Sequence, residues 1–363
     1  MQHKLILFLA TVFFINQSPA QLSSGFDRDE YIELMKLSAR TSAAENYYSK
    51  IAEPQHFKML YQSPVIGLDN LWDLWSDGKG IATISIRGTT TNSTSWLANF
   101  YAAMVPAKGQ LQLADNDVFE YELASNPKAA VHVGWLVSTA FLTRDMIPKI
   151  DSTYKSGTKN IIIVGHSQGG AIAYLVTSYL YNLQKTGKLP ADIRFKTYCS
   201  AGPKPGNLYY AYEYEAMTQN GWAYNVVNAA DWVPEVPISI QTLNDFNPSN
   251  PFIHAEGIIK KQKFPANLAL KYMYNQLSKP PNKAQKRYQK YLGSMTSKTV
   301  QKTLPGFVPP AYYPSSHYVR TGNMIVLIPD EEYLKRYPES RTPDNLFPHH
   351  LHPQYLLLAE KLK

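Results

Sequence analysis

Cysteine is almost absent from this chain of 363 residues, in which Cys199 stands alone. One cysteine cannot form an internal disulfide, so the stability of the fold must come from core packing. After residue 20 no apolar run is long enough to cross a bilayer, so no membrane-spanning helix is expected there. The hydrophobic content of 44% in turn excludes a disordered chain.

Acidic residues are missing from one long segment. Between Gly257 and Pro329 there are twelve Lys or Arg and no Asp or Glu, in a chain whose net charge is +8. The rest of the chain is therefore slightly acidic, and the basic character belongs to this segment. It predicts either contact with an anionic membrane surface or a solvated helical face. Nucleic acid is not expected as a partner, because the sequence contains no recognised binding motif.

The first twenty residues have the pattern of a signal peptide. Lys4 precedes the apolar run Leu5–Ile15, and the small residues Ser18–Ala20 form a cleavage site. A membrane anchor is the alternative, although the run is short for a bilayer. We therefore expect a signal peptide over residues 1–20 and an exported protein, which is secreted, periplasmic or at the cell surface. The mature chain, 21–363, is expected to form a single domain.

One stretch near the middle of the chain organises the rest. Ile161–Val164 are four β-branched residues, typical of a strand buried on both faces. Gly165–Gly169 then has the form Gly-x-Ser-x-Gly, and Ala171–Leu183 repeats apolar residues at helical spacing. Strand, sharp turn and helix in this order are typical of a nucleophile elbow, in which small residues avoid clashes at the turn. Ser167 is the candidate nucleophile.

Strands and helices alternate on both sides of this stretch. The alternation predicts right-handed crossovers and an α/β fold with a mainly parallel sheet flanked by helices. The predicted strands are Ile81–Ile86, Ile161–Val164, Ile193–Cys199, Tyr224–Asn228 and Met324–Ile328. Helices are expected within 21–50, at 95–104, 135–150, 171–183 and 208–218, and after Pro353. Residues 105–130 show little periodicity.

The alternation breaks before the last strand. Residues from about 240 to 315 predict a helical, basic insertion with helical pieces at Ala266–Leu277 and Lys283–Lys302, framed by prolines. No internal repeat is visible.

A serine nucleophile needs a base and an orienting carboxylate, in the order Ser, Asp or Glu, His. Asp231 follows a strand and fits the second role, with an ordinary capping aspartate as the alternative. For the base, a cluster holds His349, His350 and His352 just before the last predicted helix. We expect neither a metal nor a cofactor, because no carboxylate pair or cysteine accompanies these histidines.

The oxyanion of an acyl-transfer reaction needs N–H or O–H donors. The backbone N–H of Gln168 comes with the elbow. Thr89, in the loop after the strand Ile81–Ile86, is the second candidate, and a polar turn is the alternative there.

The chain resembles the class 3 lipases, a family of filamentous-fungal and plant triacylglycerol lipases. The matching pieces, in family order, are Ser85–Thr89 with Trp96, His132–Trp135, Gly165–Gly170, Ala201–Asn207, Val227–Pro234 and a C-terminal His–Tyr pair. The resemblance implies an α/β-hydrolase fold, with Ser167 as nucleophile, Asp231 as acid, and Thr89 and Gln168 as the oxyanion hole. The resemblance does not decide between His350 and His352 as the base, because the family's catalytic His precedes a Tyr at more than one spacing. We favour His350 over His352, because Pro353 suggests that the helix begins only there.

The function expected from these residues is that of a serine carboxylic-ester hydrolase. The resemblance implies a lipase acting on acylglycerols or related lipid esters at a lipid–water interface, through an acyl-enzyme. A phospholipase or a feruloyl-type polysaccharide esterase would use the same triad, and a non-catalytic binding module is the alternative of another class. Residues 90–130 occupy the family's lid position, where Trp96 and Phe100 belong to an apolar set that fits either a lid or a core helix.

Overall fold

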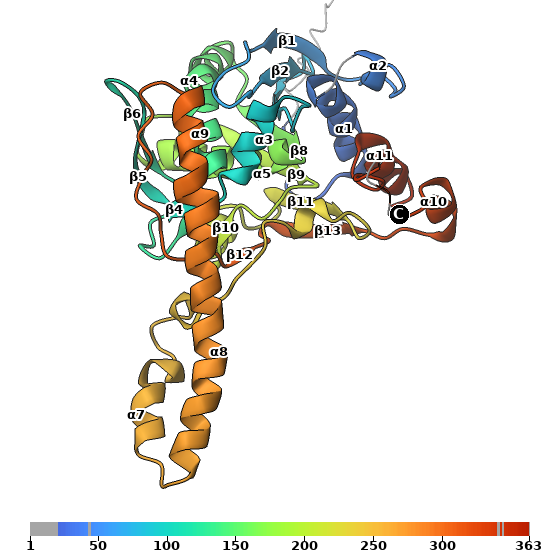
Figure 1. Ribbon diagram of the computed structural model, residues 1–363. Helices are drawn as coiled ribbons and strands as arrows, with labels where there is room; N and C mark the ends of the chain where they lie inside the picture. Colours follow the sequence, from blue (N-terminus) through green and yellow to red (C-terminus); the bar gives the residue numbers. More distant parts are fainter. Residues whose placement is uncertain (1–20, 43–44, 340–341, 343–344, 363) are drawn as a thin grey trace, which may run out of the picture.

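The computed structural model describes residues 21–42, 45–339, 342 and 345–362 (Figure 1). The predicted signal peptide, residues 1–20, lies outside the described residues. Within them, no helix has both the length and the apolar character that crossing a membrane requires.

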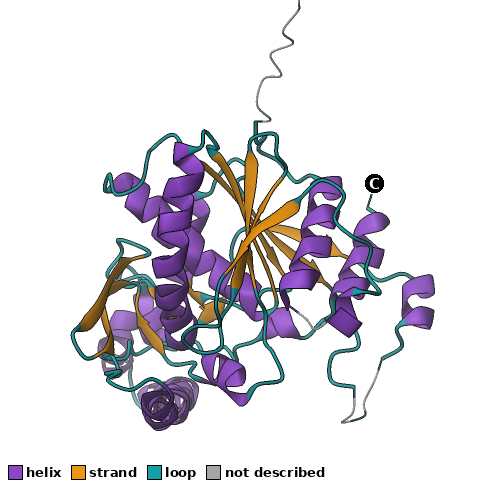
Figure 2. Ribbon diagram, turned by 90° about the horizontal axis from the view of Figure 1, so that it is seen from above, coloured by secondary structure: helices purple, strands orange, loops and turns teal. Residues whose placement is uncertain are grey.

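A seven-stranded sheet forms the centre of the molecule, with helices on both faces (Figure 2). Its order is β1 (Lys58–Gln62), β2 (Trp72–Ser76), β3 (Ile81–Ile86), β8 (Asn160–His166), β9 (Arg194–Ser200), β11 (Ala223–Asn228) and β13 (Asn323–Leu327). In this sheet β3, β8, β9, β11 and β13 are parallel to one another. At one edge, β2 pairs antiparallel with β3, and β1 pairs antiparallel with β2. The predicted mainly parallel sheet is confirmed, and all five predicted strands belong to it.

The β-branched run in β8 is explained by two cores, one on each face of the sheet. Ile161 and Ile163 pack in the core under α4 (Val133–Lys155) and α5 (Gln168–Lys185). Ile162 and Val164 point the other way, into the core that also holds Leu34 and Tyr355. Those two residues come from α1 (Arg28–Ser42) and α11 (His352–Glu360), which pack against each other. Since side chains alternate along a strand, a strand with a core on each face needs apolar residues throughout.

Residues 105–130, in which the sequence shows little periodicity, are rich in strands. They contain the hairpin of β5 (Lys108–Ala114) and β6 (Asp117–Glu122). The short strands β4 (Met104–Pro106) and β7 (Ala130–His132) pair with β10 (Gly206–Asn207) and β12 (Tyr318–Val319) in a second sheet. Strands of two or three residues are too short to show a period, which is why the sequence did not reveal this sheet.

The expected helices are present, with different ends. The N-terminal one is divided between α1 and α2 (Glu45–Tyr48), and the helix expected at 95–104 is α3 (Ser93–Phe100), since Met104 already begins β4. The remaining short helices are α6 (Leu208–Met217), η1 (Val233–Glu235), η2 (Leu243–Asp245) and α10 (Glu331–Arg336).

The helical, basic insertion begins as a long projection from the domain, and its last helix lies against the domain (Figure 1). It consists of η3 (Pro251–His254), α7 (Ala255–Lys260) and α8 (Ala266–Gln289), which continues through the π-helix η4 (Lys290–Met295) into α9 (Thr296–Thr303). The two helical pieces expected here are one helix, which passes through Pro280 and Pro281. The two prolines are tolerated because this part of the helix lies at the surface. There, water can form the hydrogen bonds to the backbone carbonyls that proline leaves unpaired.

The turn from β8 into α5 is the tightest part of the fold. Ser167 connects them with φ 61° and ψ −129°, a region that residues with side chains rarely adopt. A Cβ on Gly165 would collide with the carbonyl of Gly169, and one on Gly169 with the carbonyl of Ile86. Both glycines are therefore required by the approach of α5 to β8 and β3.

Gly169→Ala should destabilise the protein by about 1–3 kcal/mol or more, because the added methyl group overlaps the backbone of β3. Gly257→Ala, in α7, is the matched control: no atom lies within 4 Å of its new methyl group. That change should be neutral or stabilise by up to about 1 kcal/mol. Urea unfolding of both variants checks this, and equal effects would show that the turn is not tightly packed.

Candidate active site

Ser167 lies at the end of β8, where its side chain is accessible between buried neighbours. His166 and Gln168 are buried, whereas Ser167 is partly exposed. Its backbone is fixed on both sides, since its N–H donates to the carbonyl of Ser200 (2.9 Å) and its carbonyl accepts from Ala171 (3.1 Å). The hydroxyl is thus held in place while staying within reach of solvent.

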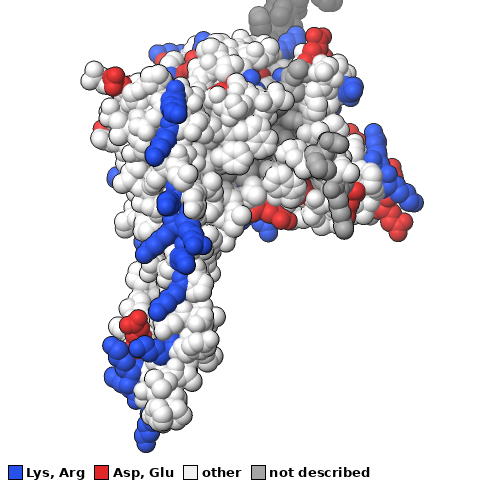
Figure 3. Space-filling model, viewed as in Figure 1, with Lys and Arg blue, Asp and Glu red and all other residues white. Residues whose placement is uncertain are grey.

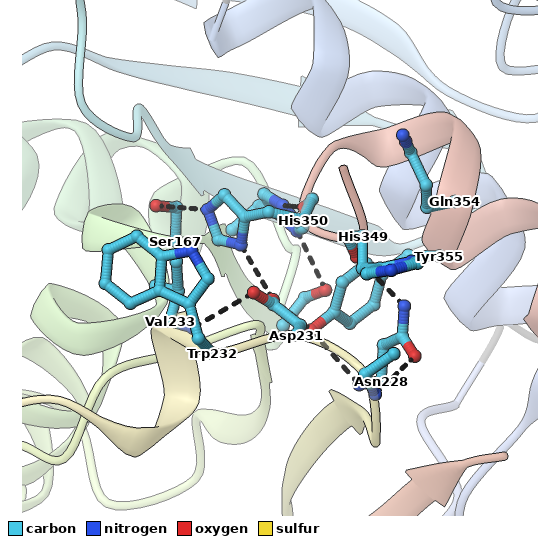
Figure 4. Close-up of polar contacts among 12 residues, drawn as sticks. Ser167, Asn228, Asp231, Trp232, Val233, His349, His350, Gln354 and Tyr355 are labelled. Atoms are coloured by element: carbon cyan, nitrogen blue, oxygen red, sulfur yellow. Dashed lines mark hydrogen bonds and ion pairs between the residues drawn. The ribbon is translucent and has the colours of Figure 1, made fainter. Parts of the chain in front are cut away.

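A chain of hydrogen bonds leads from Ser167 to Asp231 through His350 (Figure 4). Ser167 Oγ lies 2.8 Å from His350 Nε2, and His350 Nδ1 lies 2.7 Å from Asp231 Oδ2. Because a carboxylate only accepts, the imidazole proton belongs on Nδ1. Nε2 then carries a lone pair directed at the serine hydroxyl, the arrangement needed to remove its proton.

The buried carboxylate of Asp231 has three donors. Besides His350, Tyr355 Oη donates to Oδ2 (2.7 Å) and the N–H of Val233 donates to Oδ1 (3.0 Å). Burial, together with the nearby Asp231, raises the pKa of Tyr355, so this phenol keeps its proton and remains a donor. Tyr355 is the tyrosine of the C-terminal His–Tyr pair, but the sequence alone does not show that its hydroxyl contacts Asp231.

Asn228 joins the loop that follows β11 to the loop that precedes α11 (Figure 4). Its Nδ2 donates to Tyr333 Oη (2.8 Å) and to the carbonyl of His349 (2.9 Å). Its Oδ1 accepts from the N–H of Ala230 (3.1 Å), and its carbonyl accepts from the N–H of Asp231 (3.0 Å). One buried amide therefore fixes the loop of Asp231 against the loop of His350.

A second, buried chain of hydrogen bonds holds the backbone carbonyl of His350. His166 Nε2 lies 2.7 Å from the His350 carbonyl, and its Nδ1 lies 3.0 Å from Ser200 Oγ, which is 2.7 Å from Tyr31 Oη. Burial, with smaller contributions from His352 and His350, holds the pKa of His166 well below its usual value. The ring is therefore neutral, and because a carbonyl only accepts, Nε2 donates to it. Ser200 then donates to Nδ1, and Tyr31 donates to Ser200.

The other two histidines of the cluster make different contacts. His352 Nδ1 lies 3.1 Å from Tyr47 Oη and its Nε2 lies 3.3 Å from Ser38 Oγ. Burial lowers the pKa of His352 to about 3. His349 Nδ1 lies 3.1 Å from Tyr333 Oη. Of the three, His350 alone has hydrogen bonds to both Ser167 and Asp231 in the described part of the chain.

The loop with Gly88 and Thr89 lies against the elbow. A Cβ on Gly88 would lie 2.9 Å from the carbonyl oxygen of His166 and 3.5 Å from Ser167 Cβ. Gln168 is the first residue of α5, so its N–H has no acceptor within the helix. The structure therefore brings the loop of Gly88 and Thr89 next to Ser167, on which the N–H of Gln168 follows directly.

Asn99, which the sequence did not single out, connects these two residues. Its Nδ2 donates to Thr89 Oγ1 (3.0 Å), and its Oδ1 accepts from Gln168 Nε2 (2.8 Å) and Trp135 Nε1 (3.1 Å). An asparagine near the end of a short helix carries no recognisable motif. Only the approach of α3 to the start of α5 shows what it does.

The oxyanion loop is also held from its outer side. Thr90 Oγ1 donates to Asp69 Oδ2 (2.6 Å), and Arg87 donates to the Asp69 carbonyl (2.8 Å). Both contacts hold the loop against residues 66–70. The loop of Thr89 is therefore fixed by Asp69 on one side and by Asn99 on the other.

Aromatic rings surround the approach to His350. Phe347 lies 5.6 Å from the His350 ring, 5.5 Å from Trp232 and 6.3 Å from Trp96, as measured between centroids. Phe100 extends the group from α3, 6.0 Å from Trp96. Trp232 is 43% exposed and Phe100 is 56% exposed, so this apolar surface faces solvent. Three apolar residues that follow Phe100, namely Tyr101, Met104 and Val105, belong instead to the buried core.

The described residues contain no group of three or more His, Cys, Asp or Glu side chains placed to hold a metal ion.

The chain matches a family model and several solved structures. The model described as Lipase (class 3) matches residues 83–240. A fungal lipase–inhibitor complex has 20% identity and a TM-score of 0.45, covering 58% of this chain and 74% of that one. Lipase II from Rhizopus niveus has 22% identity, a TM-score of 0.42 and the same coverage. The lipase from Rhizopus microsporus var. chinensis has 21% identity and a TM-score of 0.43, covering 61% of this chain and 75% of that one. The search of curated proteins found no match.

The family match spans the elbow, the loop of Thr89 and the loop of Asp231, which are the parts that the structure assembles around Ser167. It coincides with the α/β-hydrolase sheet whose five parallel strands carry these loops. Residues 83–240 are therefore similar to the class 3 lipase family, and the chain is a carboxylic-ester hydrolase.

Proposed function

We propose that the protein is an exported lipase that cleaves acylglycerols or related lipid esters with Ser167 as nucleophile, His350 as base and Asp231 as orienting acid. The observation that carries this proposal is the continuous hydrogen-bond chain from Ser167 Oγ through His350 to Asp231. Its three members come from parts of the chain far apart in sequence, and only the fold brings them together.

In the proposed reaction, the three side chains act in two steps. His350 Nε2 takes the proton of Ser167 while the hydroxyl oxygen attacks the ester carbonyl, and the imidazolium donates to the Asp231 carboxylate. The oxyanion is held by the N–H of Gln168 and by Thr89. The protonated His350 gives its proton to the departing alcohol, which leaves an acyl-enzyme. Water, deprotonated by the same histidine, then releases the fatty acid and restores the serine hydroxyl.

Lipid esters are the substrate class that the surroundings of Ser167 favour. The group formed by Trp96, Phe100, Trp232 and Phe347 offers an apolar surface beside His350, suited to an acyl chain. Burial of each methylene contributes about 0.8 kcal/mol, or roughly a fourfold gain in kcat/KM. The signal-peptide pattern of residues 1–20 supports export.

A phospholipase is the second candidate. The observation that favours it is the row of lysines in the segment before β13, since phospholipid surfaces are often anionic. The basic segment would affect the surface on which the enzyme meets its substrate. It would not change the reaction at Ser167.

Hydrolysis of p-nitrophenyl esters of graded chain length tests the proposal. Wild-type kcat/KM should rise with acyl length, and Ser167→Ala should lose on the order of 10⁴-fold or more of kcat. Triglyceride, phosphatidylcholine and methyl ferulate then separate a lipase from a phospholipase and a feruloyl esterase. Ser178→Ala, at a buried serine of α5 outside the site, is the control. Activity of Ser167→Ala equal to that of the wild type would refute the proposal.

Asn99→Ala should lower kcat by roughly 10- to 100-fold with little change in KM, because misplaced oxyanion donors weaken transition-state binding. The change removes the contact to Thr89 and the acceptor of Gln168 Nε2. Asn182→Ala, near the far end of α5, is the control. A merely structural role for Asn99 would lower the melting temperature and leave kcat of the folded enzyme unchanged.

A further inference from the structure

The segment 251–290, here called the arm, extends away from the domain (Figure 1). It is a helical hairpin in which α7 returns along the outer half of α8. Gln285 is its one buried residue. The arm therefore contributes almost nothing to the two cores of the sheet, and its surface is free to contact something else.

The outer half of the arm exposes large apolar side chains. Phe264, in the turn between the two helices, is 78% exposed, and Leu277 is 75% exposed. Leu268, Met273 and Ile258 are also more than half exposed. Single exposed apolar residues are ordinary on protein surfaces, but a group concentrated at the end of a projection marks a site of interaction.

The same arm is strongly basic. It carries nine Lys or Arg against one acidic residue, Glu256. Along α8 and at the first residue of η4, Lys279, Lys283, Lys286 and Lys290 recur every three or four residues, which puts them on one side of the continuous helix. Figure 3 shows this row as a blue stripe that runs along the projection. No arm lysine or arginine forms an ion pair within the described structure.

We propose that the arm binds anionic lipid bilayers, with the apolar end around Phe264, Leu268 and Leu277 entering the interface and the lysines of α8 binding the head groups. Apolar side chains next to unpaired lysines suit a surface that is apolar inside and negative outside. A second copy of this chain fits poorly, because its arm would bring the same positive charge. This inference deepens the proposed function, on which it rests for the lipid substrate, by naming the surface where that substrate would be met.

The arm is rooted next to the candidate active site. Its helix continues through η4 into α9, which packs against α3, the helix that carries Asn99. At this root the N–H of Ala103 donates to the carbonyl of Leu292 (3.0 Å). A bound arm would therefore hold the domain at the lipid surface through a helix that also supports α3.

Sedimentation with vesicles tests the charge. The purified protein is mixed with phosphatidylcholine vesicles that hold either no anionic lipid or roughly 30 mol % phosphatidylglycerol, at low and high salt. Wild type should bind the anionic vesicles and be released by salt. Changing Lys279, Lys283, Lys286 and Lys290 to Gln should weaken binding by at least about 100-fold, since each lysine near the surface contributes roughly fivefold. The matched control changes four exposed lysines of the domain to Gln: Lys50, Lys58, Lys185 and Lys188.

A fluorescent label tests insertion of the apolar end. Cys199 is the chain's only cysteine and is buried, so Leu277→Cys creates a single reactive thiol. An environment-sensitive dye there should shift to shorter wavelength and brighten on anionic vesicles. The same dye at Leu60→Cys, on the edge strand β1, should not change. Replacing Phe264, Leu268 and Leu277 together by Gln should weaken vesicle binding more than the same change at Leu60, Tyr212 and Leu334.

The outcomes separate this inference from the proposed function. Ser167→Ala should bind vesicles like the wild type, and the arm variants should hydrolyse a soluble short-chain ester like the wild type. Binding that ignores anionic lipid content, or an unchanged dye spectrum at position 277, would overturn the role of the arm and leave the chemistry intact. A stable dimer whose interface covers the arm in solution would also overturn it.

Discussion

The sharp turn between β8 and α5 is the constraint on which the rest of the site depends. It holds Ser167 at a positive φ and lifts its hydroxyl above the sheet edge, and it requires Gly165 and Gly169 because backbone atoms occupy the space of any side chain. The parallel strands then determine which loops lie next to that hydroxyl. Their carboxyl ends lie at one edge, so the loops after β3 and β11 meet the elbow there.

The elbow and the loops that carry Thr89 and Asp231 were predictable because their signals are local. A run of β-branched residues, a turn with small residues and a helical period all lie within about twenty residues. The contacts that hold the site together are not local. Asn99, Tyr355 and Asn228 act across 69 to 127 residues of sequence, and nothing near them marks these partners. The choice between His350 and His352 also depends on distant contacts. Both ring nitrogens of His352 have hydrogen-bond partners elsewhere, in Tyr47 and Ser38.

The errors of prediction have simple physical causes. The second sheet is built from strands of two or three residues, each too short for a period of two to emerge. Pro280 and Pro281 predicted a break, but a helix at the surface can lose two hydrogen bonds to water and continue. That continuous helix joins the basic, apolar-tipped arm to α3, and so links the part of the chain with the greatest charge to the neighbourhood of Ser167.

The central claim is that His350 activates Ser167 with the support of Asp231. A fluorophosphonate probe tests it most directly, because the probe reacts only with an activated serine and its site is read by peptide mass spectrometry. One label is expected, on Ser167, and it should form at least about 100-fold more slowly in His350→Ala and at nearly the wild-type rate in folded His352→Ala. Labelling of another residue, or equally fast labelling of Ser167 without His350, would contradict it.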